Sequence, residues 1–160
     1  MGDKAMIISF FGHSHLLYTA DVEHKLLSVL EETVGNKKAD FYLGGYGAFD
    51  AFAYSCCKKY KQSHPNSSLV FVTPYITSEY QNNHLENLRN LYDSIVYPNI
   101  EDKPLKFAIT YRNKYMSEAS DFVIAYITHS YGGAYQAVNH AKRKGKVIFN
   151  LANSSCSIPF

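Results

Sequence analysis

Short apolar runs rich in β-branched and aromatic residues alternate along this chain with segments of helical spacing, and this alternation strongly limits the fold. The runs are nearly continuous rather than interrupted at every second residue, which is typical of strands covered on both faces of a sheet. They lie at Met6–Phe11, Ala39–Leu43, Leu69–Thr73, Ile95–Tyr97, Phe122–Ile127 and Val147–Leu151.

Between these runs, apolar residues recur every three or four positions, as in helices that bury one face. The first such segment, Val22–Val34, is followed by Gly35 and Asn36, which favour a helix end. The others are Phe49–Tyr60, Leu85–Tyr92, Phe107–Ala119 and Ala134–Ala141. Strands that alternate with helices predict an α/β fold, a three-layer, Rossmann-like, doubly wound and mostly parallel sheet of about six strands.

Length and composition indicate one globular domain over residues 1–160, since 46% of the residues are apolar and 19% are charged. No run approaches the roughly 20 apolar residues of a membrane span, and the first is too brief for a signal peptide, so we expect no membrane partner. Cys56, Cys57 and Cys156 have neither disulfide-framework nor zinc-site spacing. A reduced, cytoplasmic setting fits this composition.

The formal net charge of +2 comes with lysines and arginines scattered along the chain. The densest groups, Lys58–Lys61 and Lys142–Lys146, fall at the carboxyl ends of predicted helices, where cations interact favourably with the helix dipole. Nucleic-acid-binding proteins usually show a basic stripe, so this distribution disfavours nucleic acid as a partner.

Glycine-rich turns follow predicted strands and are the main functional signal. In parallel sheets, ligands bind outside the carboxyl ends of the strands. Glycines there let backbone N–H groups approach an anion, and a helix N-terminus adds partial positive charge. The turns match neither GxGxxG nor a Walker loop, which disfavours a dinucleotide dehydrogenase or an NTPase. The turns therefore predict a phosphate-binding edge that contains Gly12, Gly44, Gly45, Gly47, Gly132 and Gly133.

Other side chains near the same strand ends extend the predicted ligand-binding set. Asp50 could hold a ribose hydroxyl or act as a base, and it could equally be a first-turn aspartate that stabilises its helix. Arg112 could grip a phosphate at two points, or it could be a solvated surface residue. The remaining members of the set are His13, Thr73, Tyr75, Thr128, His129, Ser130 and Tyr131.

Histidines and tyrosines at this edge leave alternatives open. His13, His15 and His129 could together bind zinc, but no carboxylate or cysteine of ligand spacing accompanies them, so we expect no metal. A hydrogen bond from His13 or His129 to phosphate or to the backbone is favoured instead. A nucleobase could stack on Tyr46, Tyr75 or Tyr131.

The run Arg112-Asn113-x-x-Met116, then Ser120-Asp121, a buried strand and Tyr131-Gly132-Gly133, resembles the SLOG superfamily, named after DNA-processing protein A and the LOG proteins. In the LOG phosphoribohydrolases the pattern is Arg-Lys-x-x-Met, Ala-Asp, a strand and Gly-Gly-x-Gly-Thr-x-x-Glu. The closer resemblance is to the YpsA-like bacterial and phage branch, which begins with a strand and Gly-His, like Phe11-Gly12-His13. Its second turn, of the type Gly-Gly-x-x-Gly-x-Asp, is echoed by Gly44–Asp50.

This resemblance implies a Rossmann-like fold that binds nucleotides or their derivatives, with Arg112 and Met116 in the ligand site. The LOG glutamate falls on Gln136, which carries no negative charge and cannot serve as a base for cleavage of an N-glycosidic bond. We therefore expect a sensor or sequestering protein for a nucleotide-like ligand, such as one related to ADP-ribose, without a separate cofactor. The alternative is a nucleoside 5′-monophosphate glycosidase that uses Asp50. The resemblance is also compatible with a homodimer or a higher homo-oligomer.

Overall fold

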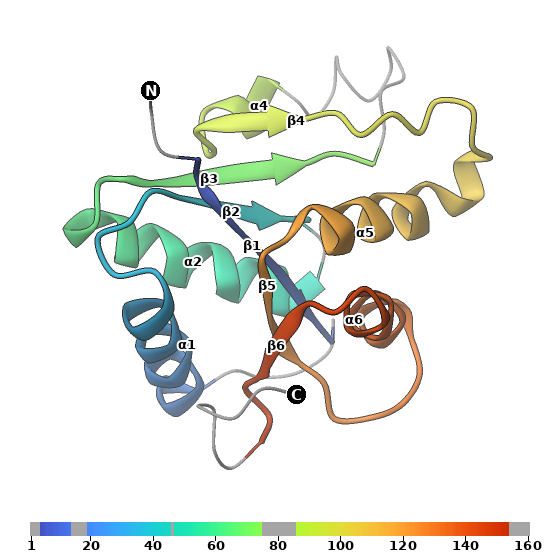
Figure 1. Ribbon diagram of the computed structural model, residues 1–160. Helices are drawn as coiled ribbons and strands as arrows, with labels where there is room; N and C mark the ends of the chain where they lie inside the picture. The colour runs from blue at the N-terminus through green and yellow to red at the C-terminus, as the bar shows by residue number, and fades with distance from the viewer. Residues whose placement is uncertain (1–3, 14–18, 46, 75–85, 154–160) are drawn as a thin grey trace.

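A parallel sheet of six strands forms the centre of the molecule, as the sequence predicts (Figure 1). The computed structural model describes residues 4–13, 19–45, 47–74 and 86–153, and the statements below concern these residues. The strands are β1 (Met6–Gly12), β2 (Ala39–Leu43), β3 (Ser67–Val72), β4 (Ser94–Val96), β5 (Phe122–Tyr126) and β6 (Val147–Asn150). All neighbouring strands pair in parallel, in the order β4-β3-β2-β1-β5-β6.

The strand order reverses between β1 and β5. The chain runs outward from β1 through β2 and β3 to the edge strand β4, then returns to place β5 on the other side of β1. The register pairs Ile8 with Phe122 and Gly12 with Tyr126, so β1 and β5 end side by side. In an open sheet of this kind, such a reversal leaves a crevice beyond the carboxyl ends of the two strands.

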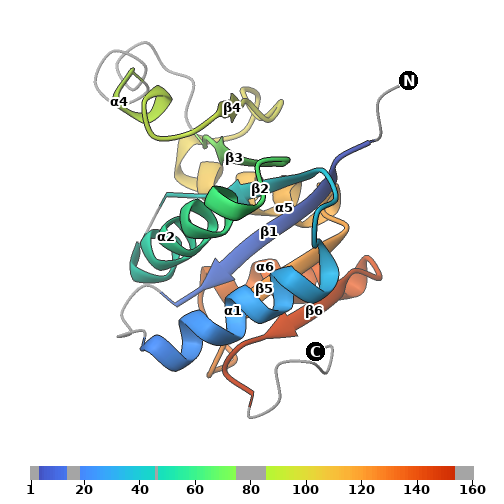
Figure 2. The same cartoon turned by 90° about the vertical axis from the view of Figure 1, so that its left-hand side faces the viewer.

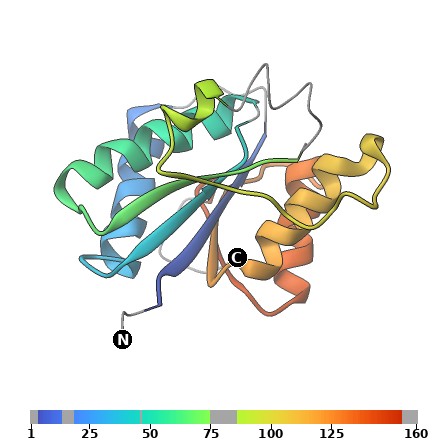
Figure 3. The same cartoon turned by 90° about the horizontal axis from the view of Figure 1, so that it is seen from above.

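Helices cover both faces of the sheet, which makes the fold a three-layer, doubly wound α/β fold (Figure 3). One face carries α1 (Ala20–Thr33) and α2 (Gly47–Ser63), and the other carries α5 (Ala108–Ala119) and α6 (Gly133–Arg143). In Figure 2 the sheet is turned so that β4 lies towards one end and β6 towards the other.

Strand β1 shows why its sequence reads as one continuous apolar run. Ile8 and Phe10 belong to the core beneath α1 and α2, whereas Phe11 belongs to the core beneath α5 and α6. Cys56 and Cys57 lie buried in the first of these cores, and burial raises the pKa of the Cys56 thiol to about 12. These two cysteines are therefore packing residues, as their place in the helical stripe of α2 indicates.

The segment between β3 and β4 departs from the sequence prediction. Within the described residues, the predicted helix Leu85–Tyr92 is the four-residue helix α4 (Glu86–Arg89). Asp93 prevents the helix from continuing, because it is bound to the backbone of Leu69. Its Oδ2 accepts a hydrogen bond from the Leu69 amide (2.7 Å), and its own amide donates to the Leu69 carbonyl (2.8 Å). The chain is thereby attached to β3 and continues as the edge strand β4.

Helix ends follow the predicted glycines. Gly35 has a φ of +56° and donates its amide to the Leu30 carbonyl, which ends α1 where the sequence predicts. A short 3₁₀ turn (Leu105–Phe107) leads into α5, so this helix begins one residue later than its apolar pattern predicts. No helix in the described ranges is both long and apolar enough to cross a membrane.

Candidate functional site

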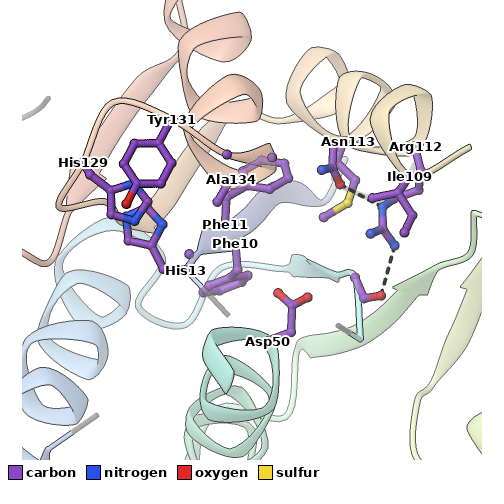
Figure 4. A pocket seen from close by; sticks show the side chains of 15 residues that line it. Phe10, Phe11, His13, Asp50, Ile109, Arg112, Asn113, His129, Tyr131 and Ala134 are labelled. Carbon is purple, nitrogen blue, oxygen red and sulfur yellow. Dashed lines mark hydrogen bonds between the residues drawn. The ribbon is translucent and has the colours of Figure 1, made fainter. Parts of the chain in front are cut away.

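A cavity of about 590 Å³ opens at the point where the strand order reverses (Figure 4). Its size falls in the range of small-molecule sites, which span about 300–1,000 Å³. Segments far apart in the sequence meet there: the ends of β1 and β2, one face of α5 and the first turns of α2 and α6. The lining residues are Phe10, Phe11, Gly12, His13, Gly44, Asp50, Ile109, Arg112, Asn113, Met116, His129, Tyr131, Gly132, Gly133 and Ala134.

The predicted glycine turns converge on this cavity. Gly12, Gly44, Gly132 and Gly133 all line it. Gly132 has a φ of +95° and precedes α6, and Gly133 and Ala134 of the first turn also line the cavity. The end of the helix at which the first N–H groups have no partner within the helix therefore lies at the cavity. A helix N-terminus of this kind attracts anions.

Two of the glycines are in close contact with side chains of other elements. A Cβ atom at Gly12 would lie 2.2 Å from Cγ of Phe49, the third residue of α2. A Cβ atom at Gly44 would lie 3.0 Å from Nη2 of Arg112. Glycine at these positions therefore lets α2 and the Arg112 guanidinium pack directly against the strand ends.

Arg112 is 2% exposed, so the interpretation of this residue as a solvated surface arginine is wrong. Its Nη1 donates hydrogen bonds to the carbonyl oxygens of Gly44 (3.0 Å) and Val72 (2.8 Å) at the ends of β2 and β3. Its Nε donates to Oδ1 of Asn113 at 2.9 Å. The guanidinium thus joins α5 to two strand ends and places a positive charge in the cavity wall.

One face of α5 forms a whole side of the cavity. Ile109, Arg112, Asn113 and Met116 have the spacing i, i+3, i+4, i+7, which places them on a single helix face. The sequence prediction contained Arg112 and Met116 and missed Ile109 and Asn113. Helical spacing from Arg112 was the signal that could have identified both.

The predicted set also omitted the apolar floor, made by Phe10, Phe11 and the first-turn residue Ala134. The phenylalanines are core residues of β1, and nothing in their local sequence separates a floor residue from any other buried residue. Asp50, in the first turn of α2, lines the cavity as predicted and supplies a negative charge opposite Arg112 and Asn113 in Figure 4.

His13 hydrogen-bonds to the backbone, one of the two partners that the sequence favours. Its Nε2 accepts a hydrogen bond from the Thr128 amide at 2.9 Å. Burial, together with the neighbouring His129, lowers the pKa of His13 from its ordinary value. Nε2 of His13 is thus engaged by the backbone in this structure, and no cluster of three metal-binding side chains occurs among the described residues.

Several predicted site residues lie near the cavity without lining it. Thr128 is exposed and contributes its backbone amide to His13, and Thr73 is fully buried behind the end of β3. Gly45 (φ +74°) and Gly47 (φ +84°) shape the turn between β2 and α2. The residues in this group are Gly45, Gly47, Thr73, Thr128 and Ser130, and Tyr46, Tyr75 and His15 lie outside the described residues. Their part in ligand binding stays a prediction.

No protein family model matches the chain. It is similar to the uncharacterized SPbeta prophage-derived protein YoqJ of Bacillus subtilis (strain 168), with 28% identity over 140 aligned positions that cover 76% of this chain and 81% of the relative.

Two solved structures of DNA processing protein A share the fold. The protein from Streptococcus pneumoniae superposes with a TM-score of 0.63 at 14% identity over 91% of this chain. The protein from Helicobacter pylori, whose structure describes a single-stranded DNA binding mode, superposes with a TM-score of 0.60 at 19% identity over the same share. The chain spans 50% and 64% of these structures, and at such identities the likeness shows a Rossmann-like fold.

Proposed function

We propose that this protein binds a nucleotide or nucleotide-derived ligand in the cavity beyond β1 and β5 and acts as a sensor or sequestering protein. The observation that carries the proposal is the convergence of Gly44, Arg112 and the N-terminus of α6 on one cavity. Backbone amides and a buried guanidinium are groups that hold phosphate oxygens at a helix N-terminus. An ADP-ribose-like molecule is one candidate of this class.

Asp50 adds a second recognition element. It is the one carboxylate among the described residues that line the cavity. A carboxylate repels phosphate and accepts hydrogen bonds from sugar hydroxyls, so a ribose is expected beside Asp50 and the phosphate nearer to α6 and Arg112. This division of charge favours a ligand that carries both groups over inorganic phosphate alone.

The family assignment is part of the same proposal. The SLOG motifs around Arg112 and Gly132 and the shared fold with DNA processing protein A support membership of the SLOG superfamily. The similarity to an uncharacterized prophage-derived protein supports a place in its bacterial and phage branch of YpsA-like proteins. The cytoplasmic setting and the homodimer remain predictions.

Isothermal titration calorimetry with nucleoside monophosphates, nucleoside diphosphates and ADP-ribose tests the proposal. An Ala134→Phe variant fills the cavity at the start of α6, and Gln136→Phe adds the same ring at an exposed position on that helix, away from the cavity. We expect saturable binding that Ala134→Phe abolishes and Gln136→Phe preserves. If the whole panel gives no heat, or if both variants bind alike, the proposal is wrong.

Single-stranded nucleic acid is the second candidate, because the structure gathers basic residues that the sequence shows as scattered. At the start of α5, Nζ of Lys103 and of Lys114 lie 5.1 and 5.3 Å from the ring centroid of Tyr111. Lys106 lies 5.0 Å from that of Phe107, which is 46% exposed. Lysines beside aromatic rings suit a nucleic-acid strand, and the Helicobacter pylori protein with this fold binds single-stranded DNA.

Salt dependence separates the two candidates. A strand held by phosphate contacts loses affinity steeply as salt rises, because binding releases counterions. A lysine-to-alanine series at Lys103, Lys106 and Lys114 would make oligonucleotide affinity depend less steeply on salt concentration. The same series would leave the binding of a mononucleotide unchanged. Oligonucleotide binding with this behaviour would replace the small-ligand proposal.

Glycosidic hydrolysis has weaker support from the geometry. Gln136, at the position of the LOG glutamate, is exposed on α6 and does not line the cavity. Hydrolysis would therefore depend on Asp50. Release of free base from AMP that is lost in an Asp50→Asn variant would establish the enzyme, whereas binding of AMP without base release supports the sensor.

A further inference from the structure

Three aromatic rings form a column at one side of the cavity. The rings of His13 and His129 stack with their centroids 3.6 Å apart and an interplanar angle of 15°. The rings of His129 and Tyr131 stack at 3.8 Å and 20°. We call His13, His129 and Tyr131 the ring column, and Figure 4 shows it across the cavity from Arg112 and Asn113.

The inner end of the ring column is fixed to the sheet edge. His13 is 8% exposed, and its Nε2 accepts the Thr128 amide hydrogen. The buried Nδ1 of His129 has no hydrogen-bond partner among the described residues. The position of the His129 ring therefore depends on its two stacking contacts, and the column places Tyr131 before any ligand arrives.

The outer end of the ring column is open. Tyr131 is 69% exposed although it lines the cavity, and one face of its ring lies against His129. A large aromatic side chain left exposed in a cavity wall offers stacking area at little conformational cost, because its ring is already held in place.

We propose that Tyr131 is the stacking platform for the base of the ligand, so that the site selects nucleotides over sugar phosphates. This inference rests on the proposed function, since it concerns the same cavity. The base lies on the exposed ring of Tyr131, and the sugar and phosphate extend towards Asp50, the first turn of α6 and Arg112. A planar heterocycle gains a stacking contact that ribose 5-phosphate cannot make.

Calorimetric titration of the full chain with the four ribonucleoside 5′-monophosphates, ADP-ribose and ribose 5-phosphate tests this inference. The variants are Tyr131→Ala, Tyr131→Phe and Tyr97→Ala, the last removing another exposed tyrosine that lies away from the cavity. We expect Tyr131→Ala to weaken binding of the best nucleotide about 5- to 150-fold, the range for loss of one base–aromatic stack. Tyr131→Phe and Tyr97→Ala should bind like the wild type.

The outcomes separate the two proposals. If Tyr131→Ala removes the preference for a nucleotide over ribose 5-phosphate, the platform is supported. If the wild type binds nucleotides but Tyr131→Ala binds them equally well, the platform is wrong and the proposed function stands. If no nucleotide binds the wild type, both are wrong. Melting temperatures of the variants, expected to match the wild type because Tyr131 is exposed, show that any loss is not one of folding.

Discussion

Arg112 and Gly44 lie in direct contact at the end of β2: Nη1 of the arginine donates to the glycine carbonyl at 3.0 Å, and the guanidinium covers the glycine Cα so closely that a Cβ there would lie 3.0 Å from Nη2. A motif residue of α5 and a turn glycine 68 positions earlier thus form one unit of the cavity wall. Arg112 consequently has a structural role in addition to the anion contact proposed for it.

An Arg112→Ala variant should lower the free energy of unfolding by about 2–4 kcal/mol, because two buried carbonyl oxygens lose charged donors. Arg112→Lys should recover only part of this loss, since one ammonium group cannot reproduce the planar fork of donors. Urea denaturation measures both. Lys114→Ala, an exposed change on the same helix, should stay within about 0.5 kcal/mol of the wild type. Equal stability of all three variants would refute the contact.

A Gly12→Ala variant should destabilise the protein by about 1–3 kcal/mol, because the added methyl group overlaps the Phe49 ring. Gly133→Ala is the matched control, as no atom lies within 4 Å of its hypothetical Cβ and its φ is not positive. Thermal unfolding of the two variants compares them directly. A Gly12→Ala protein as stable as Gly133→Ala would mean that α2 does not pack against β1 as described.

Asn150 should be needed to hold the segment that leads into the ring column. Its Oδ1 accepts from the Ile127 amide (3.0 Å), its Nδ2 donates to the Ile127 carbonyl (3.0 Å), and it is 2% exposed. Asn150→Ala should lower the free energy of unfolding by about 1–3 kcal/mol. Asn150→Asp should also destabilise, since a carboxylate oxygen would face the Ile127 carbonyl. The exposed Asn153→Ala change should have no measurable effect, and a similar loss there would argue against this role of Asn150.

Stability should fall as the pH drops below about 6.5. The pKa of His13 is lowered in the folded protein, so in this range the unfolded chain binds more protons, and the free energy of unfolding rises with pH. Protonation at Nε2 would also set an N–H group against the Thr128 amide. His13→Gln should show a smaller difference in unfolding free energy between about pH 7.5 and about pH 5.5. An unchanged difference would mean that His13 does not carry this dependence.

Periodicity in the sequence was enough to predict the strands and the layers, because burial on both faces leaves a continuous apolar run such as Phe122–Ile127. The short helix α4 was not predictable in the same way. Its apolar spacing matches a longer helix, but Asp93 binds the backbone of Leu69 and redirects the chain into β4. The long-range contact between Asp93 and Leu69 therefore limits the length of α4, although the local sequence favours a longer helix.

Parallel strand ends share one edge of a sheet, which is why the glycine turns could be placed together from the sequence. The burial of Arg112 could not be predicted from the sequence, because the carbonyl groups that accept its hydrogen bonds belong to Gly44 and Val72 at the ends of β2 and β3. The sequence also placed His13 and His129 at this edge, but their stacking into the ring column could not be predicted, because it depends on the orientation of the two side chains. Helical spacing would have identified Ile109 and Asn113.

Amide chemical shifts on titration with AMP and, separately, ADP-ribose give the most direct test of the central claim, that glycine turns from separate segments form one anion-binding edge. A second hollow at the opposite edge, lined by Lys4, Lys37, Lys38 and Asn66, is the internal comparison. We predict saturable shifts of the Gly44, Gly132 and Gly133 amides with Lys38 and Asn66 unmoved. Shifts confined to the lysine-lined hollow, or none at either edge, would contradict the account.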